Sequence, residues 1–262
     1  MLTPRERLKA RLQPMTGDTA WVLLRWARRW LWQHAWQRPV VDSVAPHPLS
    51  VYEELVGTLR HNGHAELLLG SAHLAKRHRP DRLNVVLRHD VDFDPRPLFA
   101  MTELEVRLGI RSTIYVRADG EAYRLADYQE PLRELVRQGF ELGLHSSAYR
   151  DRASIPLFQK ELCVFQECLG FPPTIMTTHG LYPFPLTLAV RLERFLRELA
   201  RQRIGGILSD EFPGYGFDVG VADSNFSRGR TYTYLTPEFR RLPSLPVGRR
   251  VQVLTHPEYW KR

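Results

Sequence analysis

Short apolar runs alternate with longer stretches of helical periodicity from residue 84 to the end of the chain. The apolar runs predict strands, and each of the stretches between them predicts a helix. The predicted strands are 84–87, 112–116, 140–145, 174–179, 207–210 and 250–256. The predicted helices are 96–108, 127–138, 154–169 and 186–202. Glycine follows most of these helices, and polar residues close the strands, so the pattern indicates repeated β/α units around a parallel sheet.

The first predicted strand runs directly into a cluster of acids, Leu87-Arg88-His89-Asp90-Val91-Asp92-Phe93-Asp94-Pro95. Side chains alternate along a strand, so Asp90 and Asp92 project to one side while Val91 points away. Carboxylates at that spacing can divide their work, one holding a metal ion and the other accepting a proton. The alternative is a helix N-cap cluster, which accounts for Asp94 followed by proline but leaves Asp90 and Asp92 unexplained.

Three histidines, His145, His179 and His256, occupy the same relative place as Asp92, where a predicted strand finishes. The carboxyl ends of parallel strands meet at one edge of a sheet, where α/β proteins build their sites. A single histidine of this kind is usually structural. Four coinciding positions on separate strands favour a metal site. His89 points away from Asp90 and is interpreted as a packing or supporting residue.

With these motifs, residues 84 to 260 resemble the polysaccharide deacetylase family, the NodB-like carbohydrate esterases, in the branch whose first motif reads His-Asp-x-Asp. The resemblance implies a distorted (β/α) barrel. It makes Asp90 the catalytic base and Asp92 a metal ligand. His145, in Gly-Leu-His-Ser, becomes a second ligand. His256, in Leu-Thr-His-Pro, becomes the general acid.

The chain departs from the family pattern at Tyr149, where the second motif normally has another histidine. A phenol is a poor zinc ligand, so we expect His179 to supply the third ligand. Asp223 is expected either to orient His256 or to contact sugar hydroxyls, and Tyr149 is placed with it among the predicted substrate-binding residues. The implied cofactor is a divalent metal ion, and zinc suits a set of carboxylate and imidazole ligands.

The resemblance implies a metal-dependent deacetylase that removes an N-acetyl group from a sugar or glycan intermediate. The cytoplasmic location inferred below adds the expectation of a surface-polysaccharide intermediate of the lipopolysaccharide or O-antigen type. The alternative is a catalytically silent relative that binds glycan or scaffolds polysaccharide assembly, and Tyr149 is the residue that favours it. The sequence contains no Gly-x-Ser-x-Gly elbow, phosphate loop or glycine-rich dinucleotide fingerprint.

The charge and the cysteine content indicate which partners and which cellular compartment to expect. The net charge of +8 comes mainly from arginine, and no recognised nucleic-acid motif accompanies it, so no nucleic-acid partner is expected. Cys163 and Cys168 have neither a metal-binding spacing nor a plausible internal bridge. With no signal peptide recognised, they indicate a reducing, cytoplasmic location, with the inner membrane face as one option.

Residues 1–80 are predicted as a helical extension that precedes the barrel domain of residues 81–262. Five of the six tryptophans lie between residues 21 and 36, interleaved with arginines, and an amphipathic helix of this kind can lie on a membrane surface. The alternative is that it packs across the barrel or forms a subunit contact. A second helix is predicted from Ser50, which begins a capping box, to about Gly63.

Overall fold

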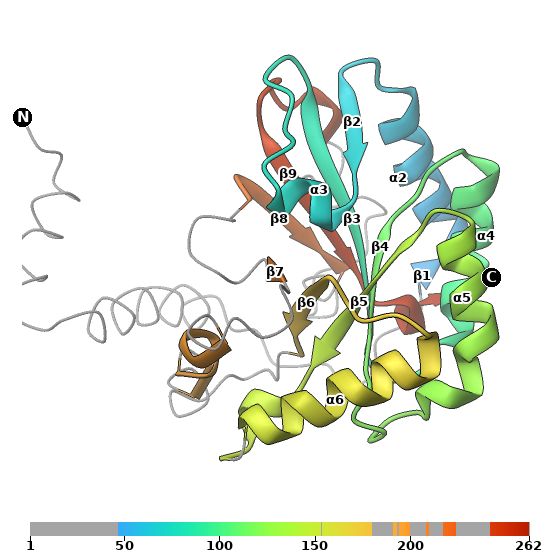
Figure 1. Cartoon of the computed structure of the whole chain (residues 1–262). Coiled ribbons are helices and arrows are strands. Elements are labelled where there is room, and N and C mark those ends of the chain that lie inside the picture. Colours follow the sequence, from blue (N-terminus) through green and yellow to red (C-terminus); the bar gives the residue numbers. More distant parts are fainter. Residues whose placement is uncertain are drawn as a thin grey trace, which may run out of the picture.

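The computed structural model describes residues 47–152, 154–179, 191–192, 194–199, 208–209, 217–223 and 242–261. Strands and helices alternate through these residues (Figure 1). The strands are β1 (His47–Pro48), β2 (Ala65–Leu68), β3 (Leu83–Val91), β4 (Thr113–Val116), β5 (Glu141–Ser146), β6 (Ile175–Thr178), β7 (Leu208–Ser209), β8 (Val219–Ala222), β9 (Arg250–Thr255) and β10 (Trp260–Lys261). The α-helices are α2 (Leu49–His61), α3 (Gly70–Leu74), α4 (Arg96–Arg107), α5 (Gln129–Arg137) and α6 (Ser154–Leu169). Short 3₁₀ turns are η1 (Leu125–Tyr128), η2 (Ala148–Arg150), η5 (Leu242–Ser244) and η6 (Pro257–Tyr259).

The main sheet has eight strands, and every pairing in it is parallel. Its order is β7-β6-β5-β4-β3-β9-β8, and β2 pairs with the first half of β3. The sheet curls into an open half-barrel, with α4, α5 and α6 on its outer side (Figure 1). The predicted α/β fold built on a distorted parallel sheet is therefore confirmed.

Strand β3 lies between β4 and β9 in this sheet and is buried along its whole length. Val85 and Leu87 belong to an apolar core shared with α2, α4 and β9. Arg88 and Asp90 alternate with Val85 and Leu87 along the strand, so they point to the opposite, inner side of the curled sheet. The two-residue period of a strand thus separates the packing face from a polar inner face.

The inner side of the curl is filled by Leu74 of α3, Tyr115 and Ile175, which form a small cluster of their own. Gly143 lies between them, because a Cβ there would be 2.7 Å from the Tyr115 ring and 2.8 Å from Ile175. Only glycine fits at this point in β5, so its place in an apolar strand is set by the close approach of the Tyr115 ring.

The segment from residue 47 to residue 80 takes part in the same fold, since β2 joins the main sheet and α2 packs on α4. The predicted second helix is present as α2, but it begins at Leu49 after Pro48, with no side-chain cap. The predicted capping box at Ser50 is therefore wrong. The domain boundary near residue 80 stays a prediction, and the tryptophan-rich helix lies outside the described residues.

A buried polar network joins α2 to β3, α4 and β9. The Tyr52 hydroxyl donates to Glu105, and His89 contacts Glu105 through Nε2 at 3.0 Å and the Thr255 hydroxyl through Nδ1 at 2.6 Å. Ser112 donates to the other oxygen of Glu105 at 2.7 Å. His89 is therefore a packing and supporting residue on the outer side of β3, as its position in the strand predicts.

The residue ranges of the other predicted helices agree closely with those of the structure. Helix α6 covers the predicted 154–169, and α4 covers all but the last residue of 96–108. The stretch 127–138 is divided between η1 and α5. Residues 191–192 and 194–199 are helical within the predicted 186–202. Strands β1, β2, β8 and β10 were not predicted.

Candidate functional site

The side chains expected at one edge of the sheet do meet there. Asp90 lies near the end of β3 and Asp92 follows it, while His145 lies near the end of β5. His179 and His256 directly follow β6 and β9. In the sheet order β6 and β5 are neighbours, as are β3 and β9, and β4 lies between the two pairs. Parallel strands with their ends in register bring these five residues to one mouth of the curl.

Asp92, His145 and His179 form a compact group whose potential ligand atoms all lie within 4.8 Å of one another. Nε2 of His145 is 3.0 Å from one carboxylate oxygen of Asp92, and Nε2 of His179 is 3.5 Å from the other. All three residues are buried. His179 therefore lies where the sequence predicts a third ligand.

The protonation of this group suits a metal ion. Burial lowers the pKa of His179 to about 4, so its imidazole is neutral at pH 7 and keeps a free electron pair. Burial opposes ionisation of Asp92, but the hydrogen bond and charge of His145 outweigh it and hold the pKa of Asp92 well below its usual range.

The two rings turn their Nε2 atoms toward carboxylates. Nε2 of His145 lies 3.0 Å from Asp92 and 3.7 Å from Asp90, and Nε2 of His179 lies 3.5 Å from Asp92. Both Nδ1 atoms are buried and have no hydrogen-bond partner among the described residues. One carboxylate and two imidazoles are ligand types that zinc accepts, and three protein ligands leave a position open in a catalytic site.

Asp90 is held by a residue that the sequence reasoning missed. Arg88 donates to both carboxylate oxygens of Asp90, from Nε and Nη2, at 2.7 Å each, and also to the Thr177 hydroxyl at 2.6 Å. Its guanidinium lies 4.9 Å from the centroid of the Tyr115 ring. Burial disfavours the charged form of Asp90, yet Arg88 and His145 keep its pKa below the usual value. The signal for Arg88 was its position two residues before Asp90, on the same side of β3.

His256 is held by Asp223. The two side chains meet at 2.6 Å through His256 Nδ1, and the His256 main-chain N–H donates to the other oxygen of Asp223 at 2.6 Å. Trp260 Nε1 donates to Asp223 at 2.9 Å. Burial lowers the pKa of His256, but Asp223, Asp92 and Asp90 outweigh burial and raise it to about 10.

Asp223 is fully buried and contacts His256 through both carboxylate oxygens, which is the geometry that the orienting alternative requires; the role itself stays a prediction. Tyr149 is buried, and its hydroxyl donates to the main-chain oxygen of His179 at 3.0 Å. This contact is with the residue that follows β6, and the substrate-binding role of Tyr149 stays a prediction.

Arg117 is a further residue that the sequence reasoning missed. It is buried at the end of β4, and its Nη1 donates to the main-chain oxygen of Asp92 at 3.2 Å. Its other nitrogens bind Asp119, which also accepts from the Ser147 hydroxyl at 2.5 Å. This chain of contacts connects the loops after β3, β4 and β5.

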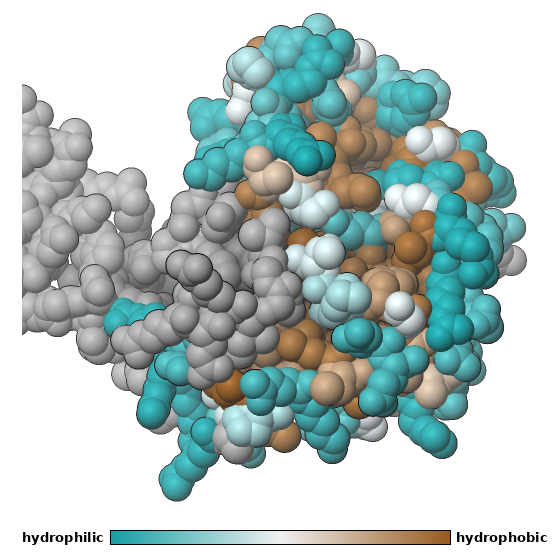
Figure 2. Space-filling model, viewed as in Figure 1, coloured by the Kyte–Doolittle hydropathy of each residue, from teal (hydrophilic) through white to brown (hydrophobic). Residues whose placement is uncertain are grey.

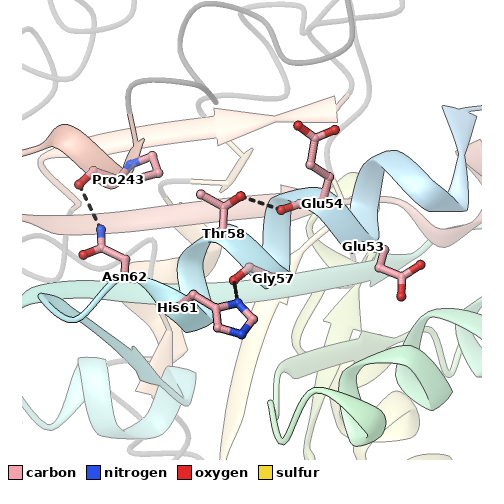
Figure 3. Close-up of a pocket in the computed structure, with 7 residues that line it drawn as sticks. All are labelled: Glu53, Glu54, Gly57, Thr58, His61, Asn62 and Pro243. Carbon is pink, nitrogen blue, oxygen red and sulfur yellow. Dashed lines mark hydrogen bonds between the residues drawn. The ribbon is translucent and has the colours of Figure 1, made fainter.

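A separate groove lies along α2, away from the strand ends (Figure 3). Its lining residues are Glu53, Glu54, Gly57, Thr58, His61, Asn62 and Pro243. The side chains of Thr58, His61 and Asn62 each hydrogen-bond a main-chain oxygen, and Asn62 Oδ1 also accepts from the main-chain N–H of His64. Among the described residues, the lining of this groove contains no cluster of potential metal ligands like the one at the strand ends.

No model of a known protein family matches this sequence, and no curated protein matches it. Among solved structures, the chain is similar to a CE4 esterase from Streptococcus mutans, with 15% identity, 84% of this chain and 87% of that chain covered, and a TM-score of 0.47. It is also similar to the catalytic domain of a peptidoglycan N-acetylglucosamine deacetylase from Eubacterium rectale (13% identity, 66% and 76% covered, TM-score 0.47). A peptidoglycan deacetylase from Bacillus subtilis gives 16% identity, 68% and 76% covered, and a TM-score of 0.43. At these values the similarity assigns no activity to this chain.

Proposed function

We propose that this protein is a metal-dependent deacetylase of the polysaccharide deacetylase family that hydrolyses an N-acetyl group on a sugar. One observation supports the proposal most strongly. The possible metal ligands Asp92, His145 and His179 lie beside Asp90, which its surroundings keep ionised, and His256, which its surroundings keep protonated. Amide hydrolysis needs a base for the attacking water and an acid for the departing amine, and Asp90 and His256 supply that pair.

In the proposed mechanism Asp90 accepts the proton of the attacking water on a carboxylate oxygen. Arg88 holds both oxygens of Asp90, so the carboxylate is aimed before the substrate arrives. His256 gives its proton to the departing nitrogen, while Asp223 fixes the ring through Nδ1 and leaves Nε2, 3.8 Å from Asp92, to act. A divalent ion, for which we propose zinc, would be held by Asp92, His145 and His179 and would polarise the acyl carbonyl.

The substrate, compartment and membrane contact belong to the proposal as well. We propose an N-acetylated sugar or surface-polysaccharide intermediate, of the lipopolysaccharide or O-antigen type, as substrate. We propose a cytoplasmic location, with the tryptophan-rich segment touching the inner membrane face. Within the described residues no helix is long and apolar enough to cross a bilayer.

The second candidate is a silent glycan-binding relative, and Tyr149 is the observation that favours it. A phenol replaces the expected ligand, but His179 brings an imidazole to within 3.5 Å of Asp92. Three protein ligands therefore remain, which supports the enzyme over the silent relative.

Metal analysis of protein purified without chelator tests the proposal first. We expect one zinc per chain in the wild type, and loss of tight binding in Asp92→Ala and His145→Ala, because two remaining ligands bind too weakly. His61→Ala is the matched control, since that histidine lies on α2 in the separate groove.

Turnover is then measured on N-acetylated oligosaccharides and nucleotide sugars by release of acetate. A wild type that binds zinc and releases no acetate from any of them would favour the silent relative. Full zinc stoichiometry in both ligand variants would show that the assigned ligand set is wrong.

A further inference from the structure

Strand β4 lies between β3 and β5 in the main sheet, but among the described residues it supplies none of the three possible metal ligands. Val116, the last residue of β4, pairs with Val91 of β3 on one side and with Leu144 of β5 on the other. The residues that follow β4 therefore start between the segments that carry Asp92 and His145.

Two side chains from the loop after β4 hold the main chain at Asp92. Arg117 Nη1 donates to the main-chain oxygen of Asp92 at 3.2 Å, and the Tyr123 hydroxyl donates to that of Val91 at 3.2 Å. The Tyr123 hydroxyl also accepts from the main-chain N–H of Arg117 at 2.8 Å, so the two donors are joined to each other. Two consecutive carbonyl groups at the end of β3 are therefore held from the neighbouring strand.

Arg117 is a charged residue in an unusual place. Hydrophilic residues lie over much of the described surface in Figure 2, whereas the Arg117 side chain is only 3% exposed. A buried charge is costly without partners. Burial disfavours this charge, but Asp119 and Glu121, which accept from Nη2 at 2.5 and 2.6 Å, outweigh burial and raise the pKa of Arg117. Since two carboxylates balance the charge, Arg117 acts on the Asp92 segment through a hydrogen bond of fixed direction.

The same loop also holds the segment that carries His145. Asp119 accepts from Nε and Nη2 of Arg117, at 3.1 and 2.5 Å, and from the Ser147 hydroxyl at 2.5 Å. Ser147 is two residues after His145, so Arg117 and Asp119 connect the two ligand-bearing segments. Nε2 of His145 is 3.0 Å from Asp92. Tetrahedral zinc with bonds of about 2 Å holds its ligand atoms roughly 3.3 Å apart, so the spacing of these two side chains suits one ion.

We propose that Arg117 and Tyr123 position Asp92 for a metal ion. By fixing Asp92 relative to His145, they determine how tightly the ion is bound and with what geometry. Groups that hydrogen-bond metal ligands from outside commonly change metal affinity by roughly 10–100-fold, and here the group that is held is the main chain of the ligand. The inference rests on the proposed metal site, but it concerns binding of the ion and not the reaction.

The test uses Zn²⁺ alone, added to the metal-free protein in competition with a chromophoric chelator. We expect Arg117→Met to raise the Kd for zinc roughly 10–100-fold, and Tyr123→Phe, which removes only a hydroxyl, to raise it roughly tenfold. Arg117→Lys keeps the charge but replaces the guanidinium fork with a single nitrogen. Its Kd should therefore rise as much as that of Arg117→Met.

Arg133→Met is the matched control. Arg133 on α5 also donates to main-chain oxygens, those of Leu169 at 3.2 Å and Cys168 at 2.8 Å, but these lie at the end of α6. The Tm of this variant should fall, because the same kind of contact is lost. Its Kd for zinc should stay within about threefold of the wild-type value.

The visible absorption of bound Co²⁺ provides a second measurement, because it reports the coordination geometry of the ion. At saturating Co²⁺ the spectra of Arg117→Met and Tyr123→Phe should differ from the wild-type spectrum, whereas that of Arg133→Met should not. A variant that is only less stable would bind Co²⁺ with the wild-type spectrum. If Arg117→Met does not fold, Tyr123→Phe and Arg117→Lys decide.

A wild-type Kd in Tyr123→Phe or Arg117→Lys, or a wild-type Co²⁺ spectrum in both Arg117→Met and Tyr123→Phe, overturns the positioning role. The same losses of affinity in Arg133→Met overturn it too. Zinc binding with the expected losses, but without acetate release by the wild type, refutes the proposed function and leaves the positioning role standing. Acetate release with unchanged zinc affinity in the variants does the reverse.

Discussion

Replacing Arg88 with methionine removes the partner of a buried carboxylate. Arg88 and Asp90 make two hydrogen bonds of 2.7 Å, and their side chains are only 9% and 5% exposed. Methionine keeps much of the length and apolar volume of the arginine stem but carries no charge. Asp90 would then be left charged and buried with no guanidinium beside it.

The expected cost is large because the pair is buried. Removing one partner of a buried ion pair costs roughly 3–5 kcal/mol, since the remaining charge stays desolvated. Arg137 and Glu134 on α5 provide the control, because their N–O distance is also 2.7 Å while their side chains are 59% and 49% exposed. An exposed pair is worth about 0–1 kcal/mol, so Arg137→Met should change stability by less than about 1 kcal/mol.

Urea unfolding of the metal-free proteins measures both variants under the same conditions. The free energy of unfolding should fall by at least about 3 kcal/mol in Arg88→Met. Adding Asp90→Leu to it should recover most of that loss, because a buried pair replaced by apolar residues is often neutral. If Arg88→Met is no less stable than Arg137→Met, burial of the pair does not govern its energy and the reasoning is refuted.

Three further outcomes are expected. Asp90→Asn should keep stoichiometric zinc and lose roughly 10²–10⁴-fold in kcat, because an amide cannot accept a proton; near-native amide hydrolysis would sink the mechanism. Burial raises the pKa of Glu161 to about 7 from an ordinary 4.5, so the folded state keeps a proton that the unfolded state releases. Stability should therefore fall by an amount on the order of 3 kcal/mol as the pH rises from about 4.5 to about 7, and Glu161→Gln, unlike the exposed control Glu167→Gln, should flatten that slope in urea unfolding. Gly143→Ala would place a methyl group 2.7 Å from the Tyr115 ring and should cost about 1–3 kcal/mol in the same assay, whereas unchanged stability would mean that the ring moves freely.

The strands that were predicted have strong local signals, and those that were missed do not. Strand β3 reads as a continuous apolar run that ends in acids, so its type and end were both visible. Strand β2 is Ala-Glu-Leu-Leu, without β-branched residues, and it follows a helix closely. Strand β8, Val-Gly-Val-Ala, is short and contains a glycine. Both are stabilised by pairing with a neighbour distant in sequence, which a local pattern does not contain.

The candidate site shows the same difference between residues with a local sequence signal and residues without one. Asp92, His145 and His179 were predicted because each ends an apolar run, and parallel strands bring such ends together. The supporting contacts depend on register between strands. Arg88 reaches Thr177 of β6, and Asp223 reaches His256 because β8 pairs with β9. Those contacts follow from the arrangement of the whole sheet, so the sequence predicted which side chains meet at the strand ends but left the role of Asp223 open and gave Arg88 none.

Tyr149 stands where the resemblance places a histidine, and in the proposed site another strand end supplies that imidazole. The resemblance places a histidine there, one turn after His145, and the chain has a phenol instead. That phenol is buried, and its hydroxyl holds the main-chain oxygen of His179 at 3.0 Å. In the proposed site the third imidazole comes from the next strand end, and Tyr149 holds the main chain of the residue that supplies it. Since a buried tyrosine needs a partner for its hydroxyl, the exchange also satisfies Tyr149 itself.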